Sequence, residues 1–137
     1  MVTELVGGLG NQLFQYAAGR ALSLHYDAQL LIGERSFERY KLRRYELGKY
    51  RIQENFASNE VLKNFGILSK FESPRYIYRV INKFLPARPC PGYGLKKESK
   101  EVQFEGSLFD QIPKNVYLTG YWQSCRYADT ISEIVRN

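Results

Sequence analysis

A glycine-rich segment between a strand pattern and a helix pattern constrains this chain more than any other feature. Residues 2–6 are mostly apolar, residues 7–10 read Gly-Gly-Leu-Gly, and helical spacing begins at Asn11. Residues 29–32 then read as a second strand that ends at Gly33. This order of strand, tight turn, helix and strand predicts an α/β fold, a Rossmann-like open sheet with flanking helices.

The expected helix has apolar residues at i and i+4 spacing, which is typical of a helix that packs one face on a sheet. Its small side chains would let it lie close to the strands, and Asn11 is expected to cap its start. The residues of the stripe and of its flank are Leu13, Phe14, Ala17, Ala18, Ala21, Leu22 and Leu24.

The rest of the chain gives shorter signals. Ser58 is expected to begin a short helix through Phe65, with Gly66 as its stop. The other expected elements are an extended piece at 45–47, a helix at 73–85, a loop at 86–97, strands at 101–104 and 116–119, and a helix from 126 onward. That last pattern is unfinished at Asn137, so we expect the chain to be cut from a longer protein.

Composition narrows the class of protein. A length of 137 residues suits one domain, 1–137, and the net charge of +6 permits an anionic partner such as a nucleotide phosphate, a lipid surface or a nucleic acid. No apolar run reaches the ~20 residues of a membrane helix. His25 is the only histidine, and Cys90 and Cys125 lack metal-ligand spacing, so we expect no zinc site and two reduced thiols.

The glycine turn is the first candidate binding site. Glycines let the backbone approach a ligand, and the unpaired N–H groups at the start of the helix favour a phosphate or a sugar hydroxyl. The candidate ligand-binding residues here are Gly7, Gly8, Gly10, Asn11 and Gln12. The dinucleotide fingerprint is excluded because its third glycine would fall on Leu13. The alternative is a tight turn that only needs small residues.

The second candidate site is the segment 120–124, Gly-Tyr-Trp-Gln-Ser, which follows the expected strand 116–119. Open α/β sheets bind ligands beyond the carboxyl ends of their strands. The rings of Tyr121 and Trp122 would stack on a sugar, and Gln123 would bind its hydroxyl groups. The alternative is that one of the two rings fills the core, because neighbouring residues of a strand face opposite ways.

Residues 7–17, Gly-Gly-Leu-Gly-Asn-Gln-Leu-Phe-Gln-Tyr-Ala, resemble the N-terminal signature of the α-1,2-fucosyltransferases, glycosyltransferase family 11. Residues 45–47, 104–112 and 120–124 with Tyr127 add to the resemblance. It implies a GT-B-type enzyme that transfers fucose from GDP-fucose, with inversion, to the 2-hydroxyl of a galactoside in surface glycan synthesis. It implies no metal and no cofactor. The glycine loop and Asn11 would contact the donor diphosphate or the acceptor, with Asn11 as a positioning residue and the catalytic base unknown.

The resemblance also implies which part of the enzyme this is. The family's His-x-Arg-Arg-Gly-Asp segment, which grips the GDP diphosphate, does not occur in the chain. Residues 1–137 therefore resemble the N-terminal, acceptor-side domain, truncated before the donor-binding domain and inactive alone. The implied partners are a sugar nucleotide and a galactoside acceptor, without nucleic acid. The implied location is the cytoplasm, with peripheral contact at the inner face of the membrane. The alternatives are a non-enzymatic carbohydrate- or nucleotide-binding module and an inactive remnant.

Overall fold

The computed structural model describes residues 1–39, 42–67, 89–99, 103–129 and 132. Its centre is a four-stranded sheet in the order β2-β1-β4-β3, in which every neighbouring pair is parallel. The strands are β1 (Val2–Glu4), β2 (Leu31–Gly33), β3 (Tyr93–Lys97) and β4 (Asn115–Thr119). The predicted α/β open sheet is therefore confirmed, with β1 and β4 as its inner strands.

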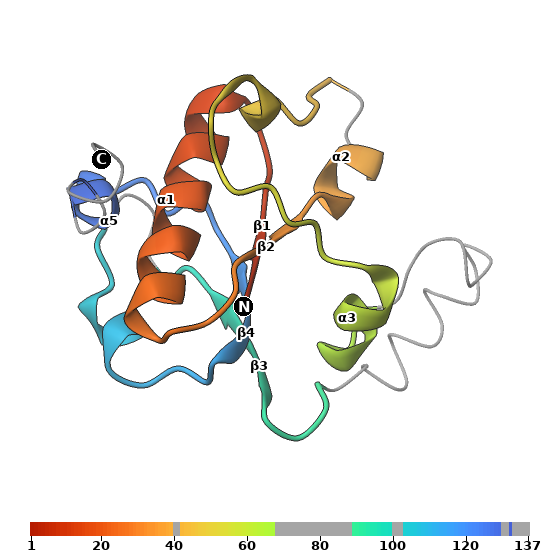
Figure 1. Ribbon diagram of the computed structural model, residues 1–137, viewed down its shortest axis with the longest axis vertical. Coiled ribbons are helices and arrows are strands. Elements are labelled where there is room, and N and C mark those ends of the chain that lie inside the picture. The colour runs from red at the N-terminus through yellow and green to blue at the C-terminus, as the bar shows by residue number, and fades with distance from the viewer. Residues whose placement is uncertain (40–41, 68–88, 100–102, 130–131, 133–137) are drawn as a thin grey trace.

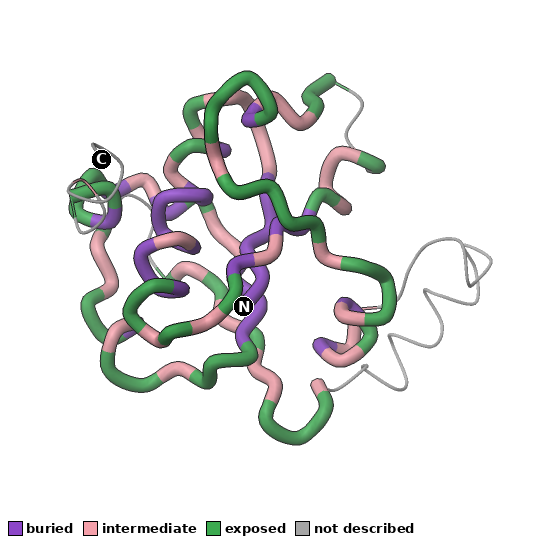
Figure 2. The backbone as a smooth tube through the Cα atoms, viewed as in Figure 1, coloured by how far each residue is buried: buried purple, intermediate pink, exposed green. Residues whose placement is uncertain are grey.

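Helices cover both faces of this sheet. The longest, α1 (Leu9–His25), lies on one face beside α5 (Cys125–Asp129), while α2 (Arg35–Arg39) and α3 (Asn59–Asn64) lie on the other (Figure 1). The buried residues gather along β1, β2 and β4 and on helix α1 (Figure 2), whereas the edge strand β3 has no buried residue.

Alternation along β4 divides the core between the two faces. Val116 and Leu118 pack in one cluster with Ala18 and Leu22 of α1. Tyr117, between them, packs on the other face with Phe65, beside α3. A parallel strand covered on both sides is expected to be apolar throughout, as these three residues are.

Helix α1 approaches β1 unusually closely. A Cβ atom on Gly19 would lie 2.9 Å from Thr3 Cβ, closer than real carbon contacts. The small residues Ala17, Ala18 and Ala21 of the helix are buried as expected, but Leu13 and Leu24 are 38% and 37% exposed. The helix therefore rests on its small residues, and the two leucines lie at the margin of its buried face.

Several local predictions are confirmed. The strand 116–119 is β4, with one additional residue at its start. The Ser58 hydroxyl accepts a hydrogen bond from the Val61 N–H at 3.3 Å and so caps α3. Gly66 follows with a φ of 71°, a left-handed conformation that suits glycine and ends the helix.

Other predictions are wrong. Residues 93–97, assigned to a loop, form the edge strand β3, and residues 103–104, within the expected strand 101–104, are not in a strand. Phe104 instead packs its ring on Tyr127, with ring centroids 4.8 Å apart. In the piece at 45–47, predicted to be extended, residues 45 and 46 are irregular and Leu47 begins a 3₁₀ turn, Leu47–Lys49. The expected helix at 73–85 lies outside the described residues.

No helix in the described part of the chain has both the length and the apolar character that a bilayer crossing requires.

The contact between α1 and β1 predicts the effect of adding one carbon atom. We expect Gly19→Ala to lower the free energy of unfolding by about 1–3 kcal/mol, because the new Cβ forces the helix away from Thr3. Gly10→Ala is the matched control, since nothing lies within 4 Å of a Cβ there. It should raise that free energy by up to ~1 kcal/mol through helix propensity. Urea unfolding measures both, and equal effects would contradict the close packing.

Candidate functional site

A cleft of about 600 Å³ opens at the carboxyl end of the sheet. It lies beyond β1, where the start of α1, the start of α2 and the turn after β4 meet. Its lining residues are Val6, Gly7, Gly8, Asn11, Ser36, Arg43 and Tyr121. Four of these were predicted as site residues, so the two candidate sites of the sequence, more than 100 residues apart, form one site.

Helix α1 begins within the glycine-rich segment, at Leu9 and not at Asn11 as predicted. Gly8 occupies the cap position without any side-chain hydrogen bond. The prediction that Asn11 caps the helix is therefore wrong, because Asn11 already lies in its first turn. Gly7 has a φ of 82°, and a Cβ there would lie 2.5 Å from Asn11 Nδ2. Glycine is required at this turn, and the first helical N–H groups have no side-chain cap.

Asn11 and Gln123 meet across the site. The Gln123 Nε2 donates a hydrogen bond to Asn11 Oδ1 at 2.8 Å, which joins the first turn of α1 to the loop after β4. Both side chains are half-buried. This amide pair fixes the orientation of Asn11 beside the glycine turn.

Gln12 is fully buried and does not line the cleft. Its Nε2 donates to the carbonyl oxygens of Gly7 at 3.0 Å and Arg44 at 2.9 Å, and its Oε1 accepts from the Glu46 N–H at 2.9 Å. Both amide protons and the oxygen therefore bind the backbone of this chain. Gln12 holds the segment 44–46 against the glycine turn.

The two predicted aromatic residues have different roles. Tyr121 lines the cleft and is 36% exposed. Trp122 is fully buried, packs with its ring edge-on to Tyr127 and adopts a φ of 54°. The alternative that one ring fills the core therefore holds for Trp122. Gly10, another predicted site residue, is exposed and is not among the lining residues.

Gln15 is a residue of this site that the sequence analysis missed. It is fully buried, its Oε1 accepts from the Val6 N–H at 2.9 Å, and its Nε2 donates to the Gly120 carbonyl at 3.0 Å. Those two backbone groups belong to the loops after β1 and β4. The sequence feature that could have identified Gln15 is a polar residue one turn after Asn11, next to the small apolar residues of the helix.

Glu98 was missed as well. Its carboxylate accepts hydrogen bonds from the N–H groups of Tyr121 at 2.7 Å and Trp122 at 3.0 Å. Gly120, with a φ of 151°, leaves room for it, because a Cβ there would lie 2.4 Å from Glu98 Cβ. Glu98 therefore holds the turn that exposes one ring and buries the next.

The cleft is electropositive on its α1 side. The Arg43 guanidinium lies over Gly8, with Nη1 3.8 Å from the position a Cβ would occupy there. Arg43 is exposed, and no carboxylate among the described residues forms an ion pair with it. The amino end of α1 adds the positive end of the helix dipole. The arrangement favours an anionic ligand.

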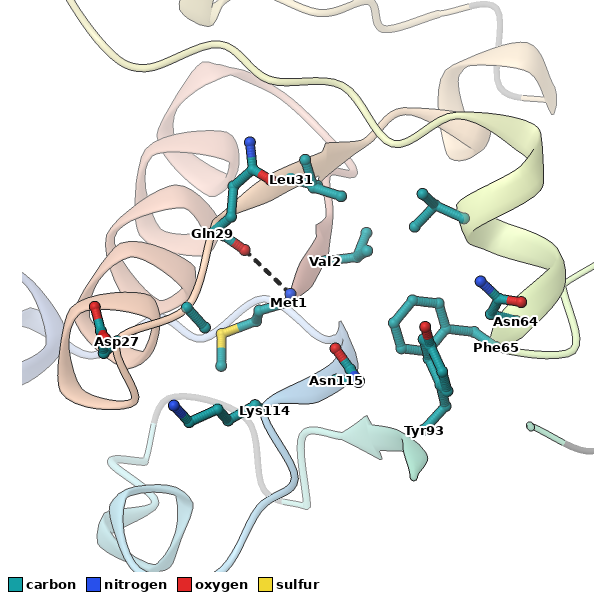
Figure 3. A pocket seen from close by; sticks show the side chains of 12 residues that line it. Met1, Val2, Asp27, Gln29, Leu31, Asn64, Phe65, Tyr93, Lys114 and Asn115 are labelled. Atoms are coloured by element: carbon teal, nitrogen blue, oxygen red, sulfur yellow. Dashed lines mark hydrogen bonds between the residues drawn. The ribbon is translucent and has the colours of Figure 1, made fainter. Parts of the chain in front are cut away.

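A second cavity, of about 340 Å³, lies at the opposite, amino end of the sheet (Figure 3). The Met1 α-amino group donates to the Gln29 carbonyl at 3.1 Å, and burial lowers the pKa of this amine. Phe65 and Tyr93 meet edge to face on its other side. Among the described residues, no group of three or more His, Cys, Asp or Glu side chains is placed to hold a metal ion.

Comparison with known proteins finds one informative similarity. The chain is 32% identical over 131 residues to an alpha-1,2-colitosyltransferase from Escherichia coli. The match covers 93% of this chain and 40% of that protein, so the chain spans about two fifths of the relative's length. No protein-family model matches the chain, and no solved structure matches it. The similarity supports a relationship to glycosyltransferases.

The bonds of Gln15 predict a large effect on stability. We expect Gln15→Met, which keeps the shape, to lower the free energy of unfolding by about 2–4 kcal/mol, because it removes the partners of the partly buried Val6 N–H and Gly120 carbonyl. The control is Gln29→Met, since the Gln29 side chain is exposed, and its effect should stay within ~0.5 kcal/mol. Chemical denaturation compares the two, and equal stabilities would refute this role of Gln15.

Proposed function

We propose that this chain is the N-terminal, acceptor-side part of an inverting glycosyltransferase of the GT-B type. The cleft at the carboxyl end of the sheet would form its half of the active site. The observation that carries the proposal is the meeting of the glycine turn, Arg43 and Tyr121 around that cleft. Similarity to a glycosyltransferase over 93% of the chain supports it.

The proposed reaction is transfer of fucose from GDP-fucose to the 2-hydroxyl of a galactoside. The resemblance of residues 7–17 to the α-1,2-fucosyltransferases supports this donor and this linkage. The relative's name carries the same α-1,2 linkage but a different sugar, colitose. Transfer of colitose is therefore the second candidate, and the two differ in the donor sugar.

The geometry of the cleft suits the charge that the reaction develops. In an inverting displacement the acceptor hydroxyl attacks the anomeric carbon while the nucleoside diphosphate leaves. Arg43 and the first N–H groups of α1 would stabilise that diphosphate, because preorganised donors act where negative charge develops. Asn11, oriented by Gln123, would position the acceptor, and Tyr121 would pack on a sugar ring. The chemistry proposed here needs no metal and no cofactor.

The proposed setting is the inner face of the cytoplasmic membrane, in the synthesis of a surface glycan. A net charge of +6 suits peripheral contact with anionic lipid. The missing partner in this proposal is a C-terminal, donor-binding domain.

The reading frame beyond Asn137 is the first experiment. Continuation into a His-x-Arg-Arg-Gly-Asp segment is the expected result. The protein encoded by the full frame should then be assayed with GDP-fucose and with nucleotide-activated colitose on a galactoside, and the product linkage determined by NMR. A stop codon after Asn137, together with tight binding of GDP by the chain alone, would instead favour a nucleotide-binding module.

Arg43 and its neighbour Arg44 provide a matched pair for testing the cleft. Both are exposed, but only Arg43 lines the cleft. In the full-length protein, Arg43→Ala should lower kcat/KM about tenfold or more, because one charge-assisted contact to a phosphate is lost. Arg44→Ala should change kcat/KM less than about twofold, since its side chain lies outside the cleft and its carbonyl bond to Gln12 remains. Steady-state kinetics at fixed ionic strength measures both, and equal losses would count against an anion site at Arg43.

A further inference from the structure

Glu4, the last residue of the inner strand β1, has a buried carboxylate at the carboxyl end of the sheet. It is 7% exposed and lies on the face covered by α2 and α3. Its Oε1 accepts hydrogen bonds from both the N–H and the hydroxyl of Ser36, each at 2.7 Å. Its Oε2 accepts from the Tyr117 hydroxyl at 2.5 Å. Burial of a carboxylate is costly even with such partners, so its presence needs a reason.

Ser36 connects this buried carboxylate to the cleft. It is the second residue of α2, is half-buried, and is one of the residues that line the cleft. The other polar side chains on the lining are the amide of Asn11, the guanidinium of Arg43 and the phenol of Tyr121. An amide and a guanidinium do not accept a proton near neutral pH, and a neutral phenol is a poor base. Among the side chains of the described lining, only that of Ser36 is hydrogen-bonded to a carboxylate.

A purely structural role would not require the charge. A glutamine at position 4 would accept both Ser36 bonds through its oxygen and would donate its amide to the Tyr117 hydroxyl. It would hold α2 on the sheet at a smaller desolvation cost than a carboxylate. What glutamine cannot do is take up a proton.

We propose that Glu4 and Ser36 form the proton relay of the transfer reaction, an inference that rests on the function proposed above. The acceptor hydroxyl gives its proton to Ser36 Oγ while Ser36 gives its own proton to Glu4 Oε1. The acceptor oxygen forms its bond to the anomeric carbon of the donor sugar. The bond from that carbon to the phosphate oxygen breaks, and its electron pair leaves with the nucleoside diphosphate. One proton ends on Glu4, and the negative charge ends on the leaving group beside Arg43.

The relay is tested by kinetics of the full-length natural protein and four variants: Ser36→Ala, Ser36→Thr, Glu4→Gln and the double variant Glu4→Gln/Ser36→Ala. General base catalysis contributes ~10²–10⁴-fold, so Ser36→Ala and Glu4→Gln should each lower kcat by about 100-fold or more. The KM for donor and acceptor should change less than about threefold, because binding groups remain. Ser36→Thr, which keeps a hydroxyl, should retain most of the kcat.

The double variant separates a relay from two independent contributions. Members of one relay fail together, so the double variant should be no slower than the slower single variant. Losses that multiply would overturn the relay. A kcat of Ser36→Ala within about threefold of the unsubstituted value would also overturn it. This comparison stays decisive if Glu4→Gln does not fold, which circular dichroism reports.

The unsubstituted protein distinguishes the two proposals. If the unsubstituted protein transfers the sugar and Ser36→Ala has nearly the same kcat, the relay is overturned and the proposed function stands. No transfer from either activated sugar to any galactoside would overturn the proposed function, and the relay with it.

Discussion

The carboxamide of Gln15 is the interaction on which the site depends. It spans from the Val6 N–H to the Gly120 carbonyl and so joins the loops that leave the two inner, adjacent strands β1 and β4. Without the Gln15 side chain, both of these partly buried backbone groups would lose their hydrogen-bond partner within the protein. The Gln15 side chain can reach both loops because α1 lies close to β1. A Cβ atom on Gly19 would lie only 2.9 Å from Thr3 Cβ. The packing of α1 on β1 therefore also determines where the loops after β1 and β4 lie.

Two more side chains in the first turns of α1 extend this arrangement. Gln12 holds the segment 44–46 and thereby places the neighbouring Arg43 beside Gly8. Asn11 meets Gln123 in the loop after β4. One face of the helix therefore holds three loops at the carboxyl end of the sheet. A site built in this way is positioned by a rigid helix and not by the loops themselves, which is how ligand groups are held at fixed distances.

The sequence was sufficient for elements with a strong local pattern and insufficient where distant contacts decide. Strand β4 and helix α3 were predicted from periodicity and capping. Strand β3 was not predicted, because this edge strand contains Gly94 and two lysines and lacks a clear apolar alternation. The sequence predicted the helix cap at Asn11 because its side chain can accept a backbone N–H. The true cap position, Gly8, is set by backbone geometry that the sequence pattern does not reveal. The glycine turn, Asn11 and Tyr121 were found from local motifs. Arg43 and Ser36 were not, because only the fold brings them to the cleft.

The two carboxylates near the site show why partners, and not burial alone, determine what an acid can do. Glu98 binds two backbone N–H groups, which donate but cannot accept a proton in exchange, so it can only hold a turn in place. Glu4 binds the hydroxyl of Ser36, which can donate and accept at the same oxygen, and Ser36 is one of the residues that line the cleft. A proton can therefore pass through Ser36 to Glu4 without any movement of the backbone. No such proton transfer is possible through the N–H groups that bind Glu98 at the Tyr121 turn, although Glu98 is more exposed than Glu4.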